Sequence, residues 1–147
     1  MSVWFEGSNN IECTIEQVKQ SFENLGDHYA GIVSLMPGLT SVDLVEQGND
    51  FVIIRTNEGI MKRTNIARRD EADRVTLEFD EEYQAGSKVT AKSHFLNEFT
   101  ATDEGIKHRA IISDVKAPGF LGFFYRTFAS ASIGNAILTS YKTYLEK

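Results

Sequence analysis

The stretch RVTLEFDEEY, residues 74–83, decides the fold class of this chain. Its odd-numbered positions are apolar or aromatic apart from Glu81, whereas its even-numbered positions are all polar. Alternation with a period of two residues is typical of a β-strand that packs one face on a core and exposes the other to water. The stretch therefore predicts an antiparallel sheet that is covered on one side.

Similar strand signals continue before and after this stretch. Between residues 39 and 116 we expect six strands, separated by turn sequences that include QGND, NEG, DEAD, QAGS and TDEG. Short connections of this kind indicate an antiparallel meander. A further strand at residues 3–13 raises the expected number of strands to seven.

Two stretches with helical signals follow the first predicted strand. Thr14-Ile15-Glu16-Gln17 has the pattern of a capping box, in which the Thr14 and Gln17 side chains bond free backbone N–H groups. We expect this first helix to end at Gly26 in a left-handed conformation, and a second helix to follow over residues 27–35. Met36-Pro37-Gly38 then stops the helical run, because the residue before proline is driven away from helical angles.

The last segment predicts a long helix over residues 119–145, with one broad apolar face that is rich in phenylalanine. Near the middle of the helix this face carries small residues, namely Thr127, Ser130, Ala131 and Gly134. Small side chains there could leave a hollow between helix and sheet for a ligand. Alternatively, they let the helix approach the sheet closely, as glycine and alanine often do.

Composition is that of an ordinary globular protein. The 147 residues are 41% hydrophobic and 24% charged, so we expect residues 1–147 to form a single domain around one core. The formal net charge of −6 argues against nucleic acid as a partner. Cys13 has no second cysteine to pair with, and no apolar run is long enough to span a bilayer. We therefore expect a cytoplasmic protein without stable membrane insertion, either a monomer or a weak homodimer.

The order of strand, two helices, six strands and long helix resembles the helix-grip superfamily, also called START-like, polyketide cyclase/dehydrase-like or SRPBCC. The resemblance covers nearly the whole chain and rests on Phe5-Glu6-Gly7, the capped helix at Thr14, Met36-Pro37-Gly38-Leu39 and the Phe-rich last helix. It implies an α+β helix-grip fold, in which a curved seven-stranded antiparallel sheet wraps the C-terminal helix. It also implies a cavity for a small apolar molecule that is lipid-, polyketide- or isoprenoid-like.

Polar residues that the alternation turns inward are candidates for the few polar groups of such a cavity. The predicted ligand-binding residues are Arg55, Phe79, Glu81, Tyr83, Ser93, Phe95, Asn97, Thr127, Ala131, Gly134 and Leu138. A buried arginine beside a buried acid is equally explained as a structural ion pair. Asp114 is a weaker inward candidate, because residues 106–116 alternate in a way that allows either face to be the inner one.

No metal and no cofactor are expected. His28, His94 and His108 show no metal-ligand spacing with each other or with Cys13, and a glycine-rich phosphate loop and a nucleophile elbow are absent.

Three functions fit these observations, and a carrier or sensor of a small apolar molecule is preferred. A cyclase-, aromatase- or dehydratase-like enzyme would use the same cavity, with Glu81, Tyr83 or Arg55 exchanging protons with a bound carbonyl compound or polarising it. A protein-interaction module would use an exposed apolar patch at residues 120–125.

Overall fold

The computed structural model describes residues 2–85, 89–116 and 130–147. In chain order the assigned elements of these ranges are β1 (Val3–Ile11), α1 (Ile15–Ser21), α2 (Leu25–Val33), β2 (Val42–Gln47), β3 (Val52–Thr56), β4 (Gly59–Asp70), β5 (Arg74–Ala85), β6 (Val89–Thr102), β7 (Gly105–Lys116) and α4 (Ser130–Leu145). This order confirms the predicted α+β fold class. The first part of the expected last helix, residues 119–129, lies outside the described residues.

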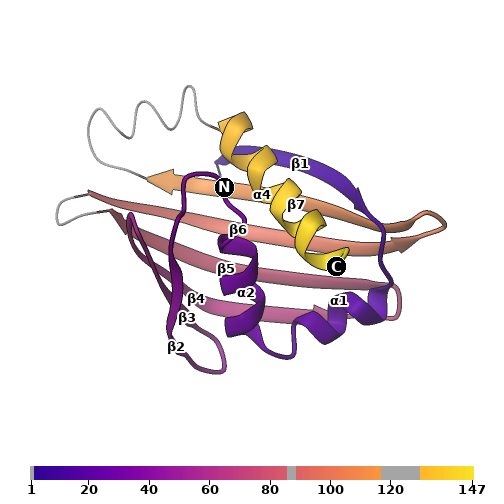
Figure 1. Ribbon diagram of the computed structural model, residues 1–147. Coiled ribbons are helices and arrows are strands. Elements are labelled where there is room, and N and C mark those ends of the chain that lie inside the picture. The colour runs from indigo at the N-terminus through magenta and orange to yellow at the C-terminus, as the bar shows by residue number, and fades with distance from the viewer. Residues whose placement is uncertain (1, 86–88, 117–129) are drawn as a thin grey trace.

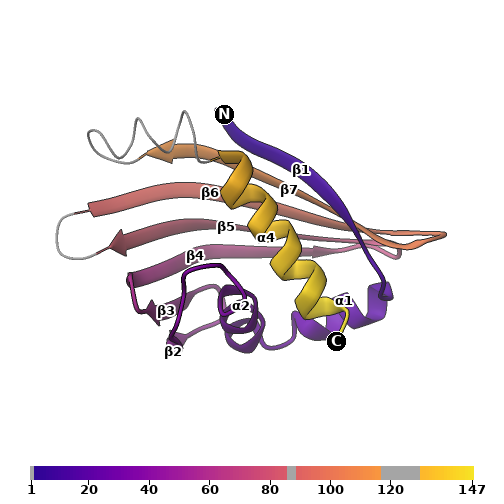
Figure 2. The ribbon, with the colours of Figure 1, turned by 45° about the horizontal axis from the view of Figure 1, so that its top comes forward.

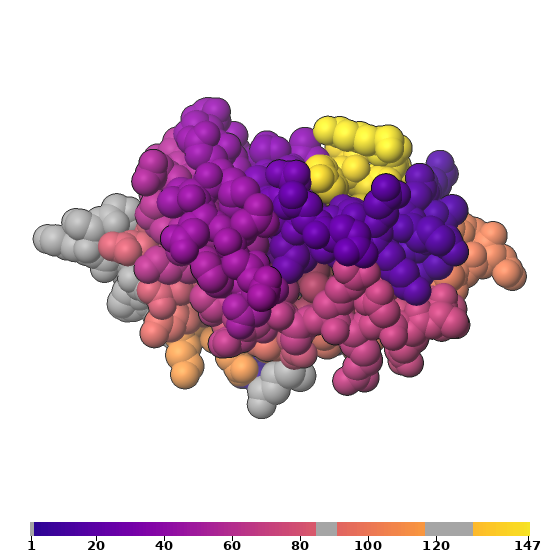
Figure 3. Space-filling view, turned by 90° about the horizontal axis from the view of Figure 1, so that it is seen from below, coloured from indigo at the N-terminus to yellow at the C-terminus, as the bar shows by residue number. Residues whose placement is uncertain are grey.

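All seven strands belong to one antiparallel sheet with the order β1-β7-β6-β5-β4-β3-β2. From β2 to β7 each strand pairs with the next one along the chain, and β1 adds to the far edge beside β7. The sheet is curved, and the helices lie on its concave side, with α4 running obliquely across the strands (Figures 1 and 2). In the view from below, the indigo N-terminal part of the chain lies next to the yellow C-terminal helix α4. The purple segment from α2 to β3 forms the neighbouring part of this surface (Figure 3).

The capping box at the start of α1 is confirmed. Thr14 Oγ1 accepts a hydrogen bond from the Gln17 backbone at 3.1 Å, and Gln17 Oε1 accepts one from the Thr14 backbone at 2.8 Å. The prediction that Gly26 ends this helix is wrong. The α1 helix ends at Phe22 in a right-handed conformation, and Gly26 lies inside α2, which begins after the N-cap Asn24. A side-chain cap for a new helix thus precedes the glycine.

In β7 the sequence allowed either the even-numbered or the odd-numbered residues to face the core, and each set does so in one part of the strand. His108 and Ile112 are buried, so the even-numbered residues face the core over most of the strand. Near Asp114, which has a φ of 55°, the pairing with β6 shifts, and Val115 beyond this bulge lines the interior. Asp114 itself is exposed, so its predicted inward position is wrong. Its carboxylate accepts a hydrogen bond from the Ser2 backbone at 3.0 Å.

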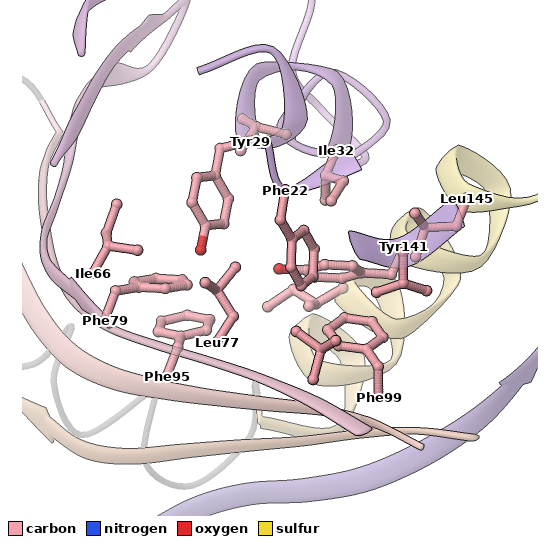
Figure 4. Close-up of a cluster of buried hydrophobic side chains, with 14 of the residues drawn as sticks. Phe22, Tyr29, Ile32, Ile66, Leu77, Phe79, Phe95, Phe99, Tyr141 and Leu145 are labelled. Carbon is pink, nitrogen blue, oxygen red and sulfur yellow. The ribbon is translucent and has the colours of Figure 1, made fainter. Parts of the chain in front are cut away.

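The hydrophobic core lies between the helices and the concave face of the sheet. Aromatic side chains from distant parts of the chain meet there, namely Phe22, Tyr29, Phe79, Phe99 and Tyr141 (Figure 4). Each of them is at most 2% exposed. Burial of one large apolar side chain contributes roughly 1.5–3 kcal/mol, so this cluster joins the helices to the sheet.

The α4 helix approaches β1 closely at Gly134, where we expected a hollow. A Cβ on Gly134 would lie 2.3 Å from the Phe5 ring, and a Cβ on Gly7 would lie 2.7 Å from the same ring. The ring of Phe5 therefore fills the space that the two missing side chains leave. The predicted hollow at Gly134 is wrong, and the alternative of close approach is the one observed.

Candidate functional site

A pocket of about 350 Å³ lies between the concave face of the sheet, α2 and α4. Small-molecule sites have volumes of roughly 300–1,000 Å³, so this pocket is at the small end of that range. Its wall is mainly apolar and includes Ile32, Val33, Met36, Phe79, Phe95, Ile112, Ile133 and Ile137. These residues come from α2, the loop after it, the sheet and α4, so the pocket exists only in the folded chain.

A row of three polar side chains crosses the sheet side of this pocket. Arg63 of β4 is the cross-strand partner of Glu81 in β5, and Glu81 is the partner of Ser93 in β6. Arg63 Nε donates to Glu81 Oε2 at 3.1 Å, and a terminal guanidinium nitrogen lies 3.0 Å from the same oxygen. The two side chains are only 8% and 12% exposed. Each charge therefore depends on the other to offset its loss of hydration.

Three aromatic rings lie close to the Arg63 guanidinium. Its central carbon lies 4.6 Å from the centre of the Phe79 ring, 4.8 Å from that of Tyr29 and 5.6 Å from that of Phe95. The rings of Phe79 and Phe95 stack with their centres 5.0 Å apart. A cation over an aromatic face gains about 0.5–2 kcal/mol, depending on how far it is desolvated. Arg63 is thus held in place by one carboxylate and several rings.

Tyr83 contributes a third kind of polar group to the pocket. Its hydroxyl lies 3.2 Å from Thr56 Oγ1 and donates to Glu58 Oε1 at 3.4 Å. Because Glu58 is exposed, this hydroxyl lies on the side of the pocket that is nearer to water. Burial raises the pKa of Tyr83, so the phenol is neutral near pH 7.

Two deeper phenols belong to the helices. Tyr141 of α4 lines the pocket, and Tyr29 of α2 packs edge-on against Phe79 with the ring centres 5.2 Å apart. Their exposed fractions are 2% and 0%, yet neither hydroxyl has a hydrogen-bond partner among the described residues. Burial raises the pKa of both phenols, to about 12 for Tyr141. Both are therefore neutral groups that can donate a hydrogen bond.

Two buried histidines also lie in the interior. His28 Nδ1 is 2.8 Å from Ser21 Oγ, and His108 Nε2 is 2.9 Å from Asn97 Oδ1. Burial lowers the pKa of each imidazole to about 3, so both are neutral. Over residues 2–85, 89–116 and 130–147, no three or more His, Cys, Asp or Glu side chains are grouped to hold a metal ion.

Five of the predicted site residues line the pocket, namely Phe79, Glu81, Tyr83, Ser93 and Phe95. All of them lie on β5 and β6, and β5 pairs over its whole length with residues 89–100 of β6 without a register shift. The regular alternation of these two strands therefore placed the side chains on the inner face. That they contact a ligand stays a prediction.

Two predicted strand residues are located elsewhere. Arg55 is exposed, and its inward position was wrong, because Val52 and Ile54 occupy the inner face of β3. Asn97 does face inward and is 1% exposed, but it bonds His108 and is not among the residues around the pocket.

The three predicted helical residues that the structure describes do not line the pocket either. Ala131 is exposed, Gly134 is covered by Phe5, and Leu138 is buried with one methyl group 3.2 Å from the Cβ position of Gly7. Thr127 lies outside the described residues. Contact with β1 rotates α4 so that a different stripe faces the pocket, consisting of Ile133, Ile137 and Tyr141.

Sequence reasoning missed Arg63, the charged group most enclosed by the pocket. Met61 and Arg63 are buried whereas Lys62 and Thr64 are exposed, which is ordinary strand alternation. The pattern breaks at Asn65, where φ is 54° and the pairing with β5 shifts. The usable signal was the acid on the inner face of the neighbouring strand, since a buried carboxylate needs a cation on the strand beside it.

The sequence matches no known protein-family model and no curated protein. Solved structures do match the fold. A conserved protein from Geobacillus kaustophilus aligns with a TM-score of 0.61 and 13% identity, over 95% of this chain and 93% of the other. A hypothetical protein from Helicobacter pylori aligns with a TM-score of 0.62 and 10% identity, over 97% and 86%.

A STAR-related lipid transfer protein from Xanthomonas axonopodis aligns with a TM-score of 0.53 and 12% identity, over 97% of this chain and 85% of the other. Within the described ranges, no helix is long and apolar enough to cross a bilayer. At such identities the likeness concerns the path of the backbone. The seven-stranded sheet, the helices on its concave face and these alignments establish that the chain has a helix-grip fold.

Proposed function

We propose that this protein binds and carries a small, mainly apolar molecule in the pocket between the sheet, α2 and α4. The observation that carries the proposal is the pocket itself, which has about 350 Å³ of space, a mainly apolar wall and a few fixed polar groups. A protein interior is normally packed without voids larger than a water molecule. A space of this size in an otherwise close-packed core is the feature expected of a ligand site.

The shared fold adds support of a weaker kind. The aligned protein from Xanthomonas axonopodis is named for lipid transfer, and it has the same arrangement of sheet and helices. Because one fold serves many functions, this likeness makes an apolar ligand reasonable and leaves the ligand to be read from the pocket.

Binding is better supported than a cyclase- or dehydratase-like reaction in the same pocket. Proton exchange requires a group that is free to change its charge, and the Glu81 carboxylate is tied to Arg63 by two contacts through one oxygen. The Tyr83 hydroxyl is already within hydrogen-bond distance of Thr56 and Glu58. Arg55 is exposed on β3 and is turned away from the ligand space.

Native mass spectrometry of the protein purified from its source cells tests the proposal. We expect the folded protein to carry an additional mass of a few hundred daltons, which is the size that fits a pocket of this volume. Ser93→Leu should remove this mass, because the larger side chain enters the pocket. Thr100→Leu is the matched control, since Thr100 lies on the outward face of the same strand and does not line the pocket.

Equal amounts of bound molecule in Ser93→Leu and in the parent would place the ligand elsewhere and contradict the proposed site. Absence of any bound mass, together with no shift in melting temperature in the presence of small apolar compounds, would contradict the proposed function.

A further inference from the structure

Tyr29 and Tyr141 are the buried side chains, among the described residues, whose only polar atom has no hydrogen-bond partner. His28, Asn97 and His108 each have an unpaired nitrogen as well, but each bonds through its other polar atom. Both side chains extend from the helices into the core, where Phe79 and Leu77 lie beneath Tyr29 (Figure 4). Tyr141 lines the pocket, and Tyr29 packs on Arg63 and Phe79, which also line it. Neither hydroxyl has a hydrogen-bond partner among the described residues.

An unpaired buried hydroxyl is unusual enough to need an explanation. Nearly all buried polar groups in proteins are hydrogen-bonded, because leaving one unpaired sacrifices the free energy of its hydration. Phenylalanine would fill either position without that cost. The two phenols therefore indicate that a partner enters from the pocket, and a neutral phenol bonds most readily to an oxygen acceptor.

The charges nearby indicate that this acceptor is uncharged. The positive guanidinium of Arg63 is already balanced by the Glu81 carboxylate at 3.0 Å. A ligand carboxylate would bring a second negative charge next to Glu81. Among the described residues that line the pocket, the other cation is Lys92, which is exposed and therefore balances a charge in the interior poorly. Burial of an unbalanced charge is costly, whereas a ketone or alcohol oxygen brings none.

We propose that the ligand of this pocket is an apolar molecule with one uncharged oxygen, a carbonyl or a hydroxyl, which accepts hydrogen bonds from Tyr141 and Tyr29. This inference rests on the proposed function and specifies the ligand class for the same pocket. Tyr141 is the principal donor because it lines the pocket directly, and Tyr29 is the second. The apolar remainder of the ligand lies against Ile133, Ile137 and Phe95.

A ligand series with one carbon skeleton tests the inference by isothermal titration calorimetry. The probes are the hydrocarbon tetralin, the ketone alpha-tetralone, the alcohol alpha-tetralol and the corresponding tetralin carboxylate. We expect the ketone or the alcohol to bind roughly tenfold more tightly than tetralin, which corresponds to one or two net hydrogen bonds. The carboxylate should bind more weakly than tetralin. The ketone and alcohol arms decide which of the two oxygen types the site prefers.

Variants identify the donors. Tyr141→Phe should reduce the affinity for the preferred oxygen compound roughly fivefold, and Tyr141→Phe with Tyr29→Phe should bring it to the level of tetralin. Neither change should weaken tetralin binding or lower the melting temperature of the free protein, because each removes an unpaired hydroxyl. Tyr144→Phe is the matched control on α4, since the Tyr144 hydroxyl donates to the Asp27 carbonyl and does not line the pocket.

The outcomes separate this inference from the proposed function. Equal binding of tetralin and both oxygen compounds would overturn the inference and leave the proposed function standing. Tightest binding by the carboxylate would also overturn it, since the pocket would then accept an anion. If none of the four compounds binds the parent protein and the purified protein also carries no bound mass, the proposed function is overturned and the inference with it. The comparison among the four compounds in the parent protein decides the matter even if a variant does not fold.

Discussion

Gly134→Ala should destabilise the protein, although alanine is the better helix former. A Cβ at this position would lie 2.3–2.4 Å from three atoms of the Phe5 ring. The ring cannot move away freely, because it also lies against Gly7 on β1. A real Cβ does not approach a ring carbon so closely, so either α4 or β1 must shift.

The expected size follows from two opposing contributions. Helix propensity favours alanine over glycine by about 1 kcal/mol in a helix interior. Overpacking of a well-filled contact costs about 1–3 kcal/mol. Because both the ring and the backbone next to it are confined, we expect the upper part of this range and a net loss of about 1–2 kcal/mol. For a chain of this size that corresponds to a fall in melting temperature of roughly 2–8 °C.

Urea denaturation followed by circular dichroism measures this difference. Asn135→Ala is the control, since Asn135 is the exposed neighbour on α4 and the change should be stabilising by a few tenths of a kcal/mol. Phe5→Leu combined with Gly134→Ala should recover part of the loss, because the smaller side chain vacates space beside the new methyl group. An increase of about 1 kcal/mol in Gly134→Ala would refute the reasoning, since it would mean that helix propensity alone decides and that α4 has room at β1.

Two further predictions concern buried charge. Arg63→Met should lower the free energy of unfolding by about 3–5 kcal/mol because Glu81 loses its partner, and adding Glu81→Leu should restore most of the loss; equal losses in the two variants would contradict a coupled pair. In NMR titrations the imidazoles of His28 and His108 should stay neutral until the pH falls to about 3, because burial lowers the pKa of both from 6.5. Their folded pKa lies below the unfolded value, so their contribution to stability is complete above pH 6.5 and is lost as the pH falls toward 3. His94 is the internal control: partial burial lowers its pKa, but hydrogen bonds with two carboxylates outweigh this effect and raise it. Titration of either buried ring near pH 6.5 would show that water reaches it.

Regular alternation in the sequence predicted much of the sheet side of the pocket. In β5 and β6 the inner residues follow a period of two throughout, and Phe79, Glu81, Tyr83, Ser93 and Phe95 all lie at the pocket as expected. A strand without irregularities carries this information locally, because every second side chain must share a face.

Where the strands are irregular or uniformly apolar, the alternation led to a wrong assignment of the inner face. Because the residues that precede Arg55 in β3 are all apolar, either the even-numbered or the odd-numbered ones could form the inner face. Choosing the odd-numbered ones wrongly placed this arginine inward. The true pocket arginine, Arg63, lies two residues before the bulge at Asn65. Bulges depend on pairing with the neighbouring strand, so they leave only a weak trace in the sequence of one strand.

The helix side of the pocket shows most clearly what the sequence alone does not determine. Helical periodicity established that residues 130–145 form an amphipathic helix with one apolar side, and the order of elements established the helix-grip architecture. Which stripe of that side faces the ligand space was decided by packing, because the Phe5 ring lies against Gly134 while Ile133, Ile137 and Tyr141 face the pocket. Local sequence therefore determined the elements and their order, since periodicity and capping act within a few residues of the chain. The rotation of α4, the pairing of Arg63 with Glu81 and the unpaired phenols were decided by tertiary structure, because each depends on contacts between residues that are far apart in the sequence.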